Sequence, residues 1–303
     1  MSARLTPAIR GAAWMLTAQA LFAVMSIGPR LIGRAVPWQE VCASRMIVAA
    51  VLAFVFAKVR RTSLAVTNLK YAWLRSIFGT LAAAGTFYVL AAPGLALGDA
   101  VTLFAVSPIF VAILSWPLLG ERVRASVAIG MVFAFAGVVF VARPSFQTAP
   151  WVVSIGALTA LGSALAMMWL RKIGPGESPE AIVFHFMCVG SVAMVLASIP
   201  VWKMPDTRSL VFMATTGLSG GLAQLALTRA YSSDNAARVS VMGYSNIVFV
   251  RALALPVFGE LPSLAQIAGS LLVIGSGVLL GLRGWAEDAK AIARSDAASR
   301  STS

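Results

Sequence analysis

Long apolar runs, separated by short segments rich in polar residues, glycine and proline, follow one another along the whole chain. A helix needs roughly 20 mostly apolar residues to cross a bilayer. Ten runs are close to this length or exceed it: 11–33, 36–57, 72–91, 98–119, 126–142, 151–170, 181–202, 209–231, 236–258 and 263–283. The breaks carry turn sequences such as Pro93-Gly94 and Pro205-Asp206. The pattern therefore predicts an all-α membrane protein with ten transmembrane helices and no separate soluble domain.

The composition agrees with this prediction. Of the 303 residues, 59% are hydrophobic and 12% are charged, whereas soluble domains carry about 25% charge. The mean hydropathy of +0.86 excludes a soluble enzyme, a disordered scaffold and a nucleic-acid binder. Both cysteines, Cys42 and Cys188, lie in apolar runs, so neither a disulfide framework nor a CxxC metal site is indicated. The sequence also has no Walker lysine motif, so we expect no cofactor and no metal.

Lys and Arg are distributed unevenly between the two sides of these spans. With a cytoplasmic N-terminus, 17 of the 24 Lys and Arg residues fall in cytoplasmic segments, Arg75 among them, and five fall outside. Positive charge gathers on the cytoplasmic side of membrane proteins. The sequence therefore predicts a multi-pass protein of the cell inner membrane with both termini in the cytoplasm. The net charge of +13 then reflects topology in a lipid bilayer. The oligomeric state does not follow from the sequence, and a monomer agrees with the predicted topology.

An internal repeat relates the two halves of the chain. The sequence Pro-Leu-Leu-Gly-Glu at 117–121 returns as Pro-Val-Phe-Gly-Glu at 256–260, an offset of 139. Glu40, with an arginine five positions later, returns as Glu180 with a histidine five positions later, an offset of 140. Two independent patterns at nearly one offset indicate a duplicated unit.

The repeat defines the domain organisation. Its halves are 11–142 and 151–283, followed by a cytoplasmic tail over 284–303. Because each half has five spans, an odd number, the second half enters the membrane from the opposite side. Inverted repeats recur among secondary transporters, whose small-molecule site lies near the midplane between the halves. We therefore expect ten helices as two inverted five-helix repeats around a central cavity.

The chain resembles the EamA family of the drug/metabolite transporter superfamily over 11–283. The resemblance rests on the run Arg-Met-Ile-Val-Ala-Ala at 45–50, on the paired Gly-Glu corners, and on Trp-Leu-Arg at 73–75. Within that family it is similar to YddG-type amino-acid exporters. The resemblance implies a basket of helices around the cavity, with spans five and ten at the periphery.

Polar groups inside the spans are the candidate site residues. Gln19, Tyr88, Gln224, Tyr244 and Asn246 carry amides or aromatic rings within apolar runs. A buried amide needs a hydrogen-bond partner, so it indicates either helix–helix bonding or a water-filled cavity, and we favour the cavity. Pro108 in the fourth span frees a carbonyl and bends the helix, which makes it a candidate gating residue.

Three basic residues inside spans each have two interpretations. Arg251 lies near the midplane and is either a fork for a substrate carboxylate or a structural arginine that caps carbonyls. Arg45 is favoured as structural, paired with Glu40 or Asp99. His185, the only histidine, is either a proton relay or a histidine satisfied within the bundle.

The predicted function is the export of small metabolites, by secondary-active or facilitative alternating access. No Asp or Glu lies at the midplane of any predicted span. Amino acids are therefore favoured over cationic drugs, which need a buried carboxylate. Export of drugs or other lipophilic molecules is the alternative. A second, from another class, is an intramembrane serine protease, because Gly-Leu-Ser-Gly at 217–220 resembles the nucleophile pattern of rhomboid proteases, with Ser219 as nucleophile and His185 as base.

Overall fold

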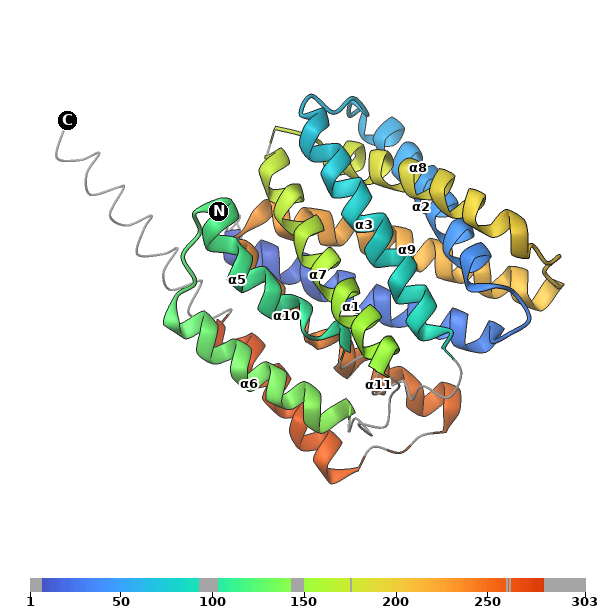
Figure 1. Ribbon diagram of the computed structural model, residues 1–303. Helices are drawn as coiled ribbons and strands as arrows, with labels where there is room; N and C mark the ends of the chain where they lie inside the picture. Colours follow the sequence, from blue (N-terminus) through green and yellow to red (C-terminus); the bar gives the residue numbers. More distant parts are fainter. Residues whose placement is uncertain are drawn as a thin grey trace.

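Helices make up every regular element that the structure describes. The computed structural model describes residues 7–92, 103–142, 150–174, 176–259, 261 and 263–280. The elements are α1 (Pro7–Ile32), α2 (Trp38–Arg60), α3 (Leu69–Leu90), α5 (Ser107–Leu119), α6 (Ala125–Ala142), α7 (Pro150–Ile173), α8 (Pro179–Ser198), η1 (Ile199–Val201), α9 (Thr207–Ser233), α10 (Ala236–Met242) and α11 (Ser245–Phe258). A last helix covers Leu264–Leu280. Figure 1 shows most of these helices inclined in the same direction, side by side in one bundle.

Six of the described helices are long and apolar enough to cross a membrane, counting α8 with η1 and α10 with α11 as one each. Three shorter apolar helices accompany them: α5, α6 and Leu264–Leu280. With α3, a further helix of 22 residues, they correspond to the ten predicted apolar runs. The protein is thus a multi-pass membrane protein, and the full set of ten spans stays a prediction.

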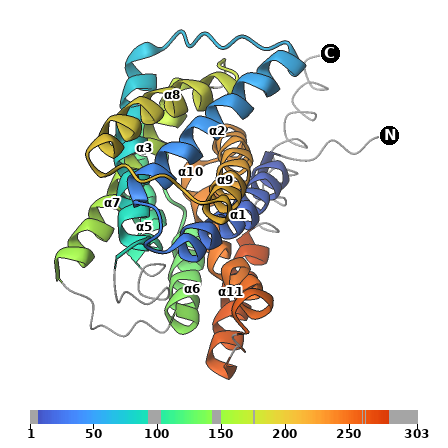
Figure 2. The same cartoon turned by 90° about the vertical axis from the view of Figure 1, so that its right-hand side faces the viewer.

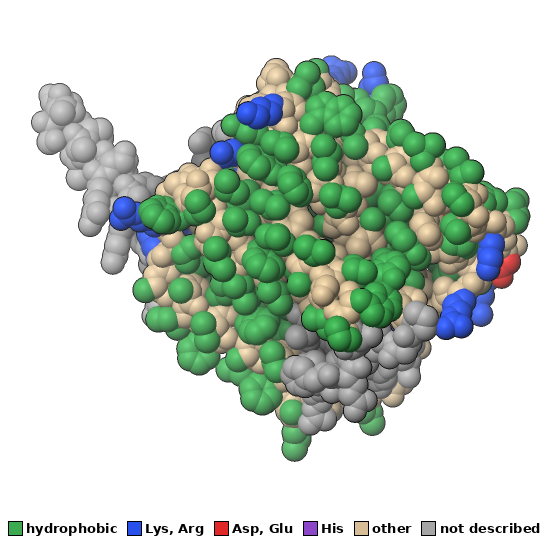
Figure 3. Space-filling model, in the orientation of Figure 1, with side chains coloured by type: hydrophobic (Ala, Val, Ile, Leu, Met, Phe, Trp, Pro, Cys, Tyr) green, Lys and Arg blue, Asp and Glu red, His purple; other side chains and the backbone are tan. Residues whose placement is uncertain are grey.

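The outer surface of the bundle is apolar. Large hydrophobic side chains such as Leu81, Trp116 and Val132 are more than 60% exposed. In Figure 3 hydrophobic side chains dominate the face in view, and Lys and Arg gather toward its two opposite ends. Water does not tolerate a continuous apolar surface of this size, whereas lipid does. The apolar band therefore faces the bilayer, and the charged ends mark its borders.

The two ends of the bundle differ in composition. We call one the basic end, defined by Arg60, Arg171, Lys172 and Arg229. We call the other the aromatic end, defined by Trp38, Tyr88, Trp151 and Trp202. Helix α1 starts at the basic end, where Arg229 lies over the ring of Trp14. Helix α7 starts at the aromatic end, where Tyr88 packs against Trp151, so the first helices of the two halves run in opposite directions.

Helix packing follows a twofold pattern between the halves. The first helix of each half packs most extensively on the third helix of the other, as α1 on α9 and α7 on α3. The second helices, α2 and α8, pack on each other. When the two halves are exchanged, the α1–α9 pair becomes the α7–α3 pair, and the α2–α8 pair stays the same. This is the arrangement expected for an inverted repeat.

The fourth and ninth predicted spans are interrupted at corresponding places. Turns at 105–106 precede α5, and turns at 243–244 separate α10 from α11. Pro108 lies in the first turn of α5. Proline has no N–H to bond the preceding turn, so it is suited to the start of a helix segment. In the second half, Gly243 and Tyr244 donate to carbonyls three residues back, which tightens the helix to 3₁₀ geometry. Such mid-helix segments often mark hinges.

Helix α6 packs along Leu264–Leu280 at the edge of the bundle. A Cβ added to Gly137 would lie 2.6 Å from the carbonyl oxygen of Gly269. A Cβ added to Gly269 would lie equally close to the carbonyl oxygen of Gly137. Figures 1 and 2 both show this pair of helices at one margin, beside α11. The peripheral position expected for spans five and ten is thus seen for the described parts of both.

Candidate functional site

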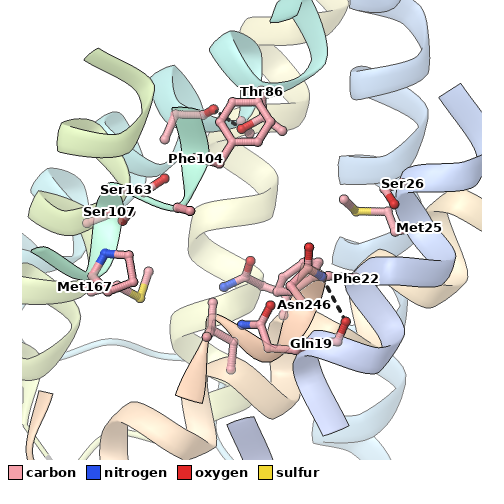
Figure 4. A pocket seen from close by; sticks show the side chains of 18 of the residues that line it. Gln19, Phe22, Met25, Ser26, Thr86, Phe104, Ser107, Ser163, Met167 and Asn246 are labelled. Carbon is pink, nitrogen blue, oxygen red and sulfur yellow. Dashed lines mark hydrogen bonds between the residues drawn. The ribbon is translucent and has the colours of Figure 1, made fainter. Parts of the chain in front are cut away.

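A cavity of about 310 Å³ lies inside the bundle. Its walls come from α1, α2, α3, α5 and α6 of the first half and from α7 to α11 of the second. Figure 4 shows Gln19, Phe22, Met25 and Ser26 on one side and Thr86, Phe104, Ser163 and Met167 on the other. The lining is mostly apolar with a few polar groups, as is typical of pockets for small molecules. No Asp, Glu, Lys or His is among its described lining residues.

Five of the predicted site residues line this cavity: Gln19, Pro108, Gln224, Tyr244 and Asn246. The Asn246 side-chain amide donates to the backbone carbonyl of Gln19 at 3.0 Å, which links α11 to α1 across the repeat boundary. The Gln19 amide reaches only the sulfur of Met15, a weak acceptor. Nε2 of Gln224 and the hydroxyl of Tyr244 are buried without a hydrogen-bond partner in the described structure. Both residues line the cavity, so they are candidate contacts for a solute.

Tyr88 lies outside the cavity lining. Its ring packs edge-on against Trp38, with 5.6 Å between the ring centroids, and tilts against Trp151 at 5.9 Å. These rings form an aromatic cluster of the kind that anchors helices at a membrane border. The structure thus gives Tyr88 a packing role, and its contact with substrate has no support from the geometry.

His185 and Ser219 do not form a catalytic pair. Nδ1 of His185 lies 2.9 Å from the hydroxyl of Ser76, and the imidazole packs edge-on against Trp73. The Ser219 hydroxyl donates to the carbonyl of Thr215 at 2.6 Å. A serine protease needs the base within hydrogen-bond reach of the nucleophile, so this arrangement gives the protease hypothesis no support. His185 is satisfied within the bundle, outside the cavity lining.

Arg251 is half-buried on α11 and is not part of the cavity lining. Two other arginines are: Arg45 on α2 and Arg75 on α3, both buried. In the sequence, Arg75 is one of the charges that predict the topology. The expected ion pair between Arg45 and Glu40 does not form. Glu40 instead accepts a hydrogen bond from the backbone N–H of Lys203 at 2.6 Å. Asp99, the other predicted partner, lies outside the described residues.

Sequence reasoning missed Arg75 because it lies near the start of a span, where an arginine normally reaches back to water. The sequence contains one indication that the Arg75 side chain has room to extend along α3. Gly79 stands four residues later on the same helix face, and the Arg75 guanidinium occupies the place that a larger side chain would need. The side chain therefore extends toward the cavity and away from the nearer end of α3.

Ion pairs join several helices at the basic end of the bundle. Glu180, at the start of α8, pairs with Arg229 near the end of α9 and lies 3.8 Å from Arg60 of α2. Only 1% of the Glu180 side chain is exposed. The pair thus connects α8 to α9 and α2 where these helices converge.

The first Gly-Glu corner contributes a second ion pair. Gly120 ends α5 in a left-handed conformation, φ +71°, which glycine adopts without strain. Glu121 then pairs with Arg171 of α7 and accepts from the N–H of Ala236, at the start of α10. The motif thus joins α5, α7 and α10. In the second corner Gly259 has the same conformation, and Glu260 lies outside the described residues.

A loop contact lies at the same end of the bundle. The Glu177 carboxylate accepts from the backbone N–H and the hydroxyl of Thr67, which joins the α2–α3 and α7–α8 loops. Burial raises the pKa of Glu177, but these hydrogen bonds outweigh it and hold the pKa below its ordinary value. The contact is therefore present near neutral pH and weakens as the pH falls through the lowered pKa.

Two segments of the chain, 9–143 and 150–282, each match the EamA-like transporter family. The chain belongs to this family. The match confirms the family resemblance seen in the sequence, and the two copies agree with a two-repeat membrane fold.

Curated relatives in this group are transporters and membrane proteins. The chain is 26% identical to the pseudopaline exporter CntI of Pseudomonas aeruginosa, over 84% of this chain and 89% of that one. It is 22% identical to a riboflavin transporter of Vibrio cholerae, over 88% and 91%. It is 27% identical to human solute carrier family 35 member G1 over 72% of this chain, a match that spans 63% of the human protein.

A solved crystal structure has the same fold. It superposes with a TM-score of 0.77 at 18% sequence identity and covers 90% of this chain and 96% of that one. At this identity the likeness concerns the fold alone.

Proposed function

We propose that this protein exports small metabolites, with amino acids as first candidates, by alternating access, either facilitated or coupled to a second solute. The observation that carries the proposal is the central cavity, which helices of both halves line. A solute site between inverted halves is what alternating access requires. The relatives support transport but name different solutes, so they do not identify the substrate.

Export of drugs or other lipophilic molecules is the second candidate, and the largely apolar lining favours it. Lipophilic cations, however, need a carboxylate in the site to balance their charge. The described lining has two arginines and no acidic residue. Cationic drugs therefore fit this cavity poorly, and carboxylate-bearing metabolites fit it better.

Transport is expected to proceed without a proton gradient. Within the described lining the only ionisable groups are arginines and tyrosines, which do not exchange protons near neutral pH. Counterflow of radiolabelled amino acids, nucleobases and lipophilic cations into liposomes tests this directly. We expect amino-acid flux at equal rates with and without an imposed pH gradient. Flux that needs the gradient would return His185 to the mechanism, and His185→Gln should then abolish the dependence.

We further propose that the basic end faces the cytoplasm of a bacterial-type inner membrane. Met204, 87% exposed at the aromatic end, and Ala65, exposed in the α2–α3 loop, report on the two sides. In a cysteine-free background, Met204→Cys should react in intact cells with an impermeant thiol reagent. Ala65→Cys should react only after the cells are opened, and the reverse pattern would overturn the orientation.

A further inference from the structure

Two positive charges are buried inside the membrane-spanning part of this protein. Arg45 is 4% exposed and Arg75 is 2% exposed, and both line the cavity. An arginine in the middle of a bilayer is costly and marks a solute pathway or a structural ion pair. Neither arginine has an ion-pair partner in the described part of the chain.

The surrounding helices hold both guanidinium groups against the cavity. Arg75 stacks on the ring of Phe186 from α8, 4.2 Å from the ring centroid, which leaves the edge of the guanidinium to donate. Arg45 passes beside Gly220 of α9, where a Cβ would lie 3.0 Å from its Nε. An alanine at either Gly79 or Gly220 would occupy space that an arginine now uses. The packing thus favours inward-facing arginines over arginines that reach the membrane border.

The unsatisfied polar atoms of the cavity are mainly hydrogen-bond donors. Among the described residues, Nε of Arg45, Nε and Nη1 of Arg75, and Nε2 of Gln224 are buried without partners. The Tyr244 hydroxyl is buried and unpartnered as well. Buried donors that lack acceptors are costly, so a ligand that supplies acceptors and negative charge relieves this cost. A guanidinium matches a carboxylate or a phosphate in a bidentate pair.

We propose that Arg45 and Arg75 form an anion-binding site for a small organic dianion, whose acidic groups are carboxylates or a phosphate. This inference rests on the transport function proposed above and narrows its substrate class. An amino acid with a neutral side chain brings one carboxylate and an ammonium group, and the described lining has no acidic residue for the ammonium. A dicarboxylate or an organic phosphate instead balances both arginines.

The test measures binding to the full-length purified protein by the shift of its unfolding temperature. The probes are succinate and glycerol 3-phosphate, with dimethyl succinate as the uncharged counterpart and putrescine as the dication. We expect stabilisation by at least one dianion and by neither control. Arg45→Gln and Arg75→Gln should each weaken that dianion about ten- to a hundredfold, the range for hydrogen bonds to charged groups. The corresponding Lys variants should be intermediate, because a point charge replaces a fork.

A matched control separates recognition from packing. Arg208 also lies over a phenylalanine, Phe212, at 5.6 Å, but it is exposed at the aromatic end. Arg208→Gln should leave dianion binding unchanged. Without ligand, the Arg45 and Arg75 variants should unfold at the wild-type temperature or above it, because an unpaired buried charge has been removed. Lower unfolding temperatures in both would indicate structural arginines and overturn the proposal.

Counterflow of the same probes in liposomes distinguishes this proposal from the transport function. Dianion binding that depends on both arginines, without counterflow, would leave the anion site standing and contradict transport. Counterflow of other solutes that does not change in either variant would support transport and overturn the anion site. Binding of neither dianion, or loss of binding in Arg251→Gln but not in the Arg45 and Arg75 variants, would also overturn it.

Discussion

Glu180→Gln is expected to open the basic end of the bundle, so that the cavity becomes reachable from that side. Glu180 is 1% exposed and pairs with Arg229, which keeps 13% of its side chain exposed. Glutamine keeps the shape but removes the charge that connects α8 to α9 and α2. Breaking a buried pair costs about 3–5 kcal/mol. Because Arg229 retains some solvent, we expect the lower end of that range, a shift in the open population of roughly a hundredfold.

Cysteine accessibility measures this opening. Ser163→Cys, on the cavity wall of α7, is introduced into a background that lacks Cys42 and Cys188. An impermeant thiol reagent is then applied to each side of sealed vesicles. Glu180→Gln should speed the reaction from the basic side. Glu177→Gln serves as the control, because it removes a half-buried carboxylate from the same end that bonds Thr67 in a loop. It should change the rate much less. Equal rates in wild type and Glu180→Gln would show that this ion pair does not hold the end closed.

The long apolar helices could be predicted from the sequence, and so could a bend at Pro108, but the break at 243–244 could not. The run 36–57 corresponds to α2 at Trp38–Arg60, because the hydropathy of a span is a sum over its own residues. The run 236–258 instead contains two helices, α10 and α11, with 3₁₀ bonds between them. The Gln19 side chain of α1 lies 3.6 Å from where a Cβ on Gly243 would stand, and a neighbour of this kind is not contained in the run itself.

The candidate site also contains residues that could be predicted from the sequence and residues that could not. Gln19, Gln224, Tyr244 and Asn246 could be found because a polar group in an apolar run is unusual by itself. Arg75 could not be found by that rule, since charge near the end of a span has a simpler explanation in topology. Its role depends on Phe186, over a hundred positions later in the chain, which stacks on it from another helix. Depth along a span also left Arg251 with two interpretations, because it gives no information about which side of the helix faces the cavity.

Gly137→Ala is expected to force α6 and Leu264–Leu280 apart and to lower stability. The added Cβ would lie 2.6 Å from the Gly269 carbonyl oxygen. This is a backbone atom, which cannot move without its helix, and overpacking of this kind typically costs about 1–3 kcal/mol.

Gly275→Ala is the matched control on the same helix pair, because nothing lies within 4 Å of its Cβ position. There alanine should instead stabilise by up to about 1 kcal/mol, since it favours helix more than glycine does. Thermal unfolding in detergent should therefore give a lower midpoint for Gly137→Ala and an equal or higher one for Gly275→Ala. If both variants shift in the same direction, close packing of these two glycines does not hold the peripheral helices together.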